Sequence, residues 1–141
     1  WSPSSISYTG NNRTHMIRVP DKGRFELRLM DGAVNPYLLQ AGVIAAGLHG
    51  INNKIDPGEP LSCNMYTDHK NYPNLKKLPD TIEDALDQLE NSKEIKEALG
   101  EDTIKSYLKL KRSEIENFNQ EEKFNKKNPV TKWEKNSTLD C

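Results

Sequence analysis

The chain has 141 residues, of which 34% are hydrophobic and 29% are charged, and its formal net charge is −1. This length suits one domain, and the low hydrophobic fraction predicts a small core. The balanced charge gives no reason to expect a nucleic-acid partner, and no apolar stretch reaches the roughly 20 residues that span a membrane.

The two cysteines, Cys63 and Cys141, match no metal-ligand spacing and no disulfide pattern of small secreted domains. We therefore predict that both are reduced thiols and that the protein is cytoplasmic. The sequence begins with Trp1 and not with Met, which predicts that the chain is a processed or excised piece.

The first third of the chain predicts a loop followed by a β-hairpin. Residues 1–10 are rich in Ser, with Pro and Gly, and indicate a loop. Residues 13–19 look extended, residues 24–29 alternate between charged and apolar side chains, and PDKG at 20–23 is typical of a turn. The hairpin would cover about 13–29 and carry its charges on one face. The charged residues of that face are Arg24, Glu26 and Arg28.

A helix is predicted next, with Asn35 as its N-cap, Pro36 in its first turn and Gly50 at its end. Because this segment is apolar on nearly all sides, we expect it to be buried. The 28 residues that follow, 52–79, contain four prolines and predict a long loop. Such loops are uncommon in compact domains and usually serve a function or pack against a neighbour.

The last part of the chain predicts helices. Thr81 and Asp84 form a variant of the capping box, Gly100 closes a short second helix, and Asp102 could cap a longer third one. Residues 119–132 are polar and should fray, with Trp133 as a final anchor. We therefore predict an α+β fold whose hairpin precedes a mainly helical region. Its two subregions would be 1–79 and 80–141.

The charged face of the hairpin has two possible interpretations. Alternating charges on an exposed strand can form a surface ladder that contributes little to stability. Alternatively, Glu26 holds a divalent cation while Arg24 and Arg28 bind phosphate or carboxylate oxygens. A single carboxylate cannot hold such an ion, so any further ligands must lie outside this chain.

Arg13 and Arg18 lie just upstream, five residues apart. On one regular strand they would point to opposite faces. Both can serve one site only if a bulge or bend lies between them, or if Arg13 precedes the strand.

A series of segments resembles the C-terminal part of the catalytic domain of glutamine synthetase. The similarity runs in order through nearly the whole chain and is closest to the GlnT and γ-glutamylmethylamide synthetase branch. The matching segments are NNRTHMIRVP, GRFELRLMDGAVNPYL, AAGLHGINNKIDPGEP, NMY, LPDTIEDALDQLENSKEIKEALG and YLKLKRSE.

The resemblance implies an ATP-dependent ligase that joins glutamate to ammonia or a small amine through a γ-glutamyl phosphate. It also implies Mg²⁺ or Mn²⁺, and an active site formed between subunits of a ring-shaped homo-oligomer. The family's other metal ligands, its ammonia site and its gating loop would lie upstream of this chain. We therefore predict that the isolated chain is inactive and that it depends on its own upstream domain and on neighbouring subunits.

The resemblance also assigns roles to individual residues. Glu26 matches a metal ligand, Arg28 the arginine that binds glutamate, and Arg24 an arginine on the nucleotide side. Arg13 and Arg18 match the pair that contacts the ATP phosphates and the transferred phosphoryl group, which makes Arg13 a candidate catalytic residue.

Other residues have less specific interpretations. Tyr66 matches the tyrosine that some bacteria adenylylate, although the TDHK that follows it departs from the enteric pattern. His15 is predicted to support strand packing, His49 to cap the end of the apolar helix, and His69 to lie in a loop.

Two alternatives to an enzyme remain open. A non-catalytic binding or scaffold module related to the synthetases would have no reason to keep all five charged residues of the hairpin region. A charged helical adaptor explains residues 80–141 but not residues 11–29.

Overall fold

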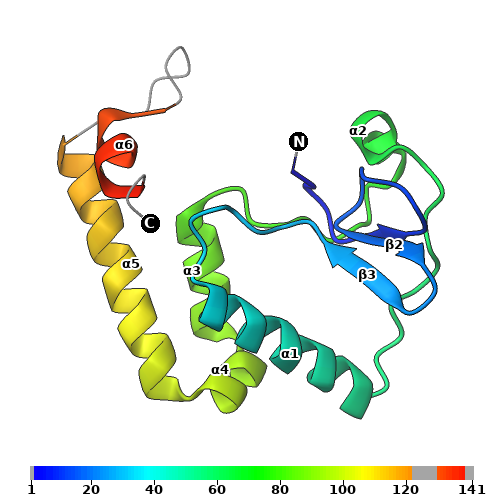
Figure 1. Ribbon diagram of the computed structural model, residues 1–141, viewed down its shortest axis with the longest axis horizontal. Helices are drawn as coiled ribbons and strands as arrows, with labels where there is room; N and C mark the ends of the chain where they lie inside the picture. Colours follow the sequence, from blue (N-terminus) through cyan, green and yellow to red (C-terminus); the bar gives the residue numbers. More distant parts are fainter. Residues whose placement is uncertain (1, 122–129, 139–141) are drawn as a thin grey trace. The chain divides into compact units, whose positions relative to one another are not determined.

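The computed structural model describes residues 2–121 and 130–138, which form two compact units (Figure 1). The first unit combines the residues up to Gly32 with Asn52–Ala85, and the second combines Ala33–Ile51 with the residues from Leu86 onward. None of the helices in the described ranges is long and apolar enough to cross a bilayer.

The first unit contains a three-stranded sheet in the order β1-β2-β3. β1 (Tyr8–Thr9) runs parallel to β2 (Ile17–Asp21), and β2 runs antiparallel to β3 (Arg24–Leu27). The predicted hairpin is therefore confirmed. Its turn is Lys22-Gly23, and Gly23 takes a φ of 79°, which glycine adopts without steric cost.

The register of the hairpin places Arg18 opposite Glu26 and Asp21 opposite Arg24. An irregularity between Arg18 and Asp21 gives β2 more residues than β3 over this interval, as in a β-bulge. Pairing continues beyond β3, because the amide of Arg28 donates to the carbonyl of Met16 at 2.9 Å.

Residues 1–10 were predicted to be a loop, but they contain β1 and pair with a distant segment. The amide of Ile6 donates to the carbonyl of Lys76 at 2.8 Å, and the amide of Leu78 donates to the carbonyl of Ser4 at 3.0 Å. A two-residue strand is too short to leave a periodic pattern in the sequence.

The predicted long loop is also ordered in part. It contains α2 (Met65–Asp68), whose N-cap Asn64 accepts a hydrogen bond from the amide of Tyr66, and a 3₁₀ helix, η1 (His69–Asn71). His69 thus begins a short helix rather than lying in a loop. This long segment packs against the N-terminal residues of the same unit. The amide of Leu61 donates to the carbonyl of Tyr8, and the side chain of Asn12 donates to the carbonyl of Cys63.

α1 (Pro36–Asn52) begins as predicted. The Asn35 side chain accepts hydrogen bonds from the amides of Tyr37 and Leu38 at 3.0 and 3.1 Å. The helix continues two residues beyond Gly50, so the predicted end was wrong. The predicted burial was also wrong, because no residue of α1 is buried in this chain.

In the rest of the described chain, up to residue 138, four further helices follow: α3 (Ile82–Asn91), α4 (Lys93–Leu99), α5 (Glu101–Glu121) and α6 (Lys132–Thr138). The Thr81 hydroxyl accepts the amide of Asp84 at 3.1 Å, which confirms the predicted cap. Gly100, with a φ of 87°, ends α4 as expected. α5 starts at Glu101, so Asp102 lies in its first turn and does not cap it.

The core of the second unit is small, as the composition predicted. Leu86, Ile104 and Leu108 are buried, and partly buried apolar side chains from α3, α4 and α5 pack around them. The ring of Trp133 meets that of Phe118 edge to face at 5.6 Å, so Trp133 anchors α6 to α5 as predicted. Of the segment expected to fray, residues 122–129 lie outside the described residues.

Candidate functional site

The Glu26 carboxylate lies between two guanidinium groups. Arg18 on β2 donates from Nη1 to Oε2 at 2.5 Å, and Arg24 on β3 donates from Nη2 to Oε1 at 2.8 Å. The first pair forms because Arg18 and Glu26 are opposite each other in the register, and the second because Arg24 and Glu26 share a strand face.

The two arginines differ in exposure. The Arg18 side chain is 11% exposed, and its Nε and Nη2 also donate to Oδ1 of Asn11. The Arg24 side chain is 63% exposed. Hydrogen bonding from Arg18, and then from Arg24, holds the pKa of Glu26 below its ordinary value against the opposing effect of desolvation.

Arg13 lies in a turn before β2 and is exposed. Arg13 precedes β2, so the alternation of side chains along that strand does not decide which way Arg13 points. The five-residue spacing from Arg18 therefore does not prevent both arginines from serving one site. Its backbone carbonyl accepts a hydrogen bond from the Tyr66 hydroxyl at 3.2 Å.

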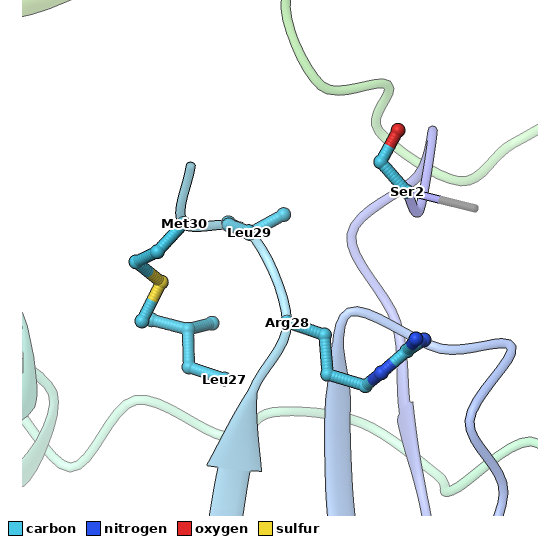
Figure 2. A pocket seen from close by; sticks show the side chains of 5 residues that line it. All are labelled: Ser2, Leu27, Arg28, Leu29 and Met30. Atoms are coloured by element: carbon cyan, nitrogen blue, oxygen red, sulfur yellow. The ribbon is translucent and has the colours of Figure 1, made fainter. Parts of the chain in front are cut away.

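Arg28 follows the end of β3, and within the described part of the chain it forms no salt bridge with Glu26. Among the described residues, its Nη1 is buried and has no hydrogen-bond partner. Arg28 lines an open hollow, in which Figure 2 shows its side chain extending away from Leu27 and Met30. The remaining lining residues are Ser2 and Leu29.

The residues of this site do not form a metal centre by themselves. No group of three or more His, Cys, Asp or Glu side chains in the described ranges is arranged to hold an ion. Glu26 is the one carboxylate among the five candidate site residues, and Mg²⁺ or Mn²⁺ needs several oxygen ligands. The donors present therefore fit one ligand of such a centre and not the whole of it.

The chemistry that the arrangement favours is anion binding. The strand pair and its flanks, residues 13–28, carry five basic and two acidic side chains, namely Arg13, Arg18, Lys22, Arg24 and Arg28 with Asp21 and Glu26. The resulting excess of three positive charges suits phosphate or carboxylate groups, for which guanidinium geometry is well matched.

Sequence reasoning missed the residues that support these arginines. Asn11 fixes Arg18, and Asn12, Thr14 and His15 bond to the segment around Cys63. Their side chains have no periodicity that marks such a role, and the partners of Asn12, Thr14 and His15 around Cys63 lie about 50 residues away. His15, predicted to support packing, is the fully buried member of this group.

Comparison with known proteins identifies the family to which this fold belongs. A family model described as the glutamine synthetase catalytic domain matches residues 1–129. The chain belongs to the glutamine synthetase family. The α+β fold and the family resemblance predicted from the sequence are thereby confirmed.

Individual relatives support the same assignment to the glutamine synthetase family. A glutamine synthetase from Rhizobium meliloti (strain 1021) is 49% identical over 140 residues, covering 99% of this chain and 30% of the relative. A glutamate–methylamine ligase from Methyloversatilis universalis is 40% identical over 143 residues, again covering 99% and 30%. The chain thus spans about a third of the length of these curated relatives.

A solved structure of GmaS in complex with ADP superimposes with a TM-score of 0.81 at 42% identity. It covers 100% of this chain, which corresponds to 30% of the GmaS chain. A ligand-free GmaS structure gives a TM-score of 0.79, so the glutamine synthetase-like fold of the segment is common to both.

Proposed function

We propose that this chain forms the phosphate- and glutamate-binding wall of an ATP-dependent ligase that joins glutamate to ammonia or a small amine. Relatives named glutamine synthetase and glutamate–methylamine ligase support the reaction class. The ADP in the similar GmaS structure supports a nucleotide as the phosphate source.

The observation that carries the proposal is the buried Nη1 of Arg28. A buried charged donor without an acceptor is unfavourable, so such a group calls for a partner, and a bound ligand is one group that can supply it. A glutamate carboxylate is an anion of the right shape for a guanidinium group.

The other arginines are proposed to bind ATP. Arg13 and Arg18 would contact the phosphates and the phosphoryl group in transfer, and Arg24 would lie on the nucleotide side. Charge builds on the phosphoryl oxygens as the bond to ADP breaks, and fixed guanidinium groups stabilise that charge.

The reaction would proceed in two steps. The γ-carboxylate of glutamate attacks the terminal phosphorus of ATP, which releases ADP and forms γ-glutamyl phosphate. The amine then attacks the activated carbonyl carbon, phosphate leaves with the bonding electron pair, and the nitrogen loses a proton to give the amide.

Glu26 is proposed to contribute one ligand to an Mg²⁺ or Mn²⁺ centre whose remaining ligands belong to other parts of the enzyme. A divalent ion in such a place would neutralise phosphate charge. Each carboxylate oxygen of Glu26 has lone pairs beyond the one used by its arginine, so both kinds of contact are compatible.

The proposal includes assembly and regulation. The active site would be completed by the upstream domain and by neighbouring subunits of a homo-oligomeric ring, in the cytoplasm, where the free thiol of Cys63 stays reduced. Tyr66 is kept as a possible modification site, since a group attached to its hydroxyl would break the contact with the Arg13 carbonyl.

Glutamate binding tests the role of Arg28. We expect L-glutamate to shift the side-chain NMR signals of Arg28 in the chain, and Arg28→Ala to weaken this binding at least about tenfold, which corresponds to 1.4 kcal/mol. Arg112→Ala is the matched control, because Arg112 pairs with Asp87 and Glu90 in the second unit. Equal losses in both variants would contradict the proposal.

Activity tests the ligase assignment. The isolated chain should show no ATP hydrolysis with glutamate and ammonium or methylamine in a coupled assay, whereas the complete parent protein should turn over. Clear turnover by the chain alone would refute its dependence on missing parts. Glutamate binding without turnover by the parent would favour the non-catalytic module.

A further inference from the structure

The turn that carries Arg13 is fixed through its backbone and its neighbours. No hydrogen bond to the Arg13 guanidinium is found among the described residues, and the side chain is exposed. The backbone carbonyl of the same residue, however, accepts the Tyr66 hydroxyl at 3.2 Å. The turn is therefore held in place while its charged group stays available to a ligand.

Residues on either side of Arg13 bond to the segment that leads into α2. The side-chain nitrogen Nδ2 of Asn12 donates to the backbone carbonyl of Cys63 at 2.9 Å. The Thr14 hydroxyl accepts the amide of Met65 at 3.0 Å and donates to Oδ1 of Asn12 at 2.8 Å. These contacts connect positions about 50 residues apart and form one network.

His15 is the most deeply placed member of the network. Its exposure is 0%, Nε2 lies 2.9 Å from the Cys63 carbonyl oxygen, and Nδ1 lies 3.1 Å from Oγ of Ser7. A carbonyl oxygen can only accept, so Nε2 carries the hydrogen and donates. In the neutral ring Nδ1 then accepts from the Ser7 hydroxyl, and the imidazole links three segments of the unit.

We propose that His15 is a positioning residue for Arg13. Its Nε2–H fixes the turn against the carbonyl of Cys63, so that the exposed guanidinium of Arg13 is presented in one place to a phosphate group. The identity of the ligand rests on the proposed function, whereas the fixing of the turn does not. The two hydrogen bonds offset the cost of burying the polar ring, and the one at Nε2 ties the turn to the Cys63 carbonyl.

The bond to Cys63 can be separated from the bond to Ser7 by two conservative substitutions. In His15→Gln the amide nitrogen lies near the position of Nε2 and can still donate to the Cys63 carbonyl. In His15→Asn the shorter amide lies near the position of Nδ1, so it can reach Ser7 but loses Cys63. Both variants keep a polar amide in the same buried place, so each is the matched control for the other.

Titration of the chain with inorganic pyrophosphate, followed on the arginine Nε signals by NMR, provides the test. We expect His15→Asn to weaken binding about tenfold, equivalent to 1.4 kcal/mol, and His15→Gln to retain most of the affinity. In the Arg13→Ala background, His15→Asn should cause no further loss, because the two residues act through one contact. The ring nitrogen signals of the unmodified chain should show the Nε2–H tautomer.

Three results would overturn the positioning role. These are equal affinities of the two His15 variants, the same loss from His15→Asn with and without Arg13, and a ring protonated at Nδ1 alone.

Absence of any pyrophosphate binding by the unmodified chain would instead contradict the phosphate site of the proposed function. Hydrogen exchange then decides the positioning role. Faster exchange of the Thr14 and Met65 amides in His15→Asn than in His15→Gln supports it, and equal exchange refutes it.

Discussion

Glu26 interacts with one nearly buried arginine, Arg18, and one exposed arginine, Arg24. The hydrogen bond from Arg18 is the largest cause of the lowered pKa of Glu26, and that from Arg24 contributes less. Because the folded-state pKa is depressed, the stabilisation from Glu26 is complete above its ordinary value of 4.5 and is lost as the pH falls through the lowered value.

An NMR titration of the Glu26 carboxyl group would measure this asymmetry. We expect its midpoint below 4.5 in the unmodified chain, a large return toward 4.5 in Arg18→Ala, and a smaller one in Arg24→Ala. Arg112→Ala should leave the midpoint unchanged. A larger effect of Arg24→Ala than of Arg18→Ala would contradict this ranking.

For the individual residues of the site, the sequence predicted which charged side chains matter but not which of them pair with one another. The alternation at Arg24, Glu26 and Arg28 was visible, because a strand places every second side chain on one face. The pairing of Arg18 with Glu26 depends on the register, and the isolation of Arg28 depends on where β3 ends. Neither is encoded in a local pattern.

Among the elements, α5 supplies most of the core of the second unit through Ile104 and Leu108. Leu110 lies on the same helix but is 57% exposed. Replacing Leu108 or Leu110 by alanine changes the helix propensity by the same amount, so a difference in stability between the two variants reports the difference in burial.

Leu108→Ala should lower the free energy of unfolding by about 3 kcal/mol, because it removes buried atoms and leaves a cavity. Leu110→Ala should change it by no more than about 0.5 kcal/mol. Urea unfolding followed by circular dichroism measures both values. Similar losses in the two variants would show that Leu108 is not a core residue.

The elements that sequence reasoning found correctly are those with local signals. Asn35, Thr81 and Gly100 each mark a helix end through the preferences of the capping positions. β1 and α2 were missed because they are only two and four residues long, and the start of α2 is also held by Thr14, which lies far away in the sequence. The burial of α1 was wrongly predicted. An apolar helix sequence indicates that the helix needs a surface to cover it, but it does not show that this surface belongs to the same chain.

For the molecule as a whole, the uncovered side of α1 is the feature with the largest consequence. Its most exposed apolar side chains follow the helical repeat and so share one face. These residues are Tyr37, Ile44, Leu48 and Ile51. An exposed apolar stripe of this kind favours association with another surface.

We expect the isolated chain to self-associate as its concentration rises, and the double substitution Ile44→Glu with Leu48→Glu to reduce this association. Sedimentation velocity would detect the change in mass. Leu110→Glu on α5 is the matched control, since it adds a charge at an exposed leucine outside the stripe. Equal reductions in both proteins would show that added charge, and not the face of α1, is responsible.

The irregularity in β2 has a consequence for how this segment can vary during evolution. It lies between the Arg18–Glu26 pair and the turn at Lys22-Gly23. Insertions or deletions at an exposed hairpin tip are well tolerated, and a bulge absorbs a change in strand length. Descendants of this sequence can therefore lengthen or shorten the tip, and alter what it touches, while the charged pair keeps its alignment.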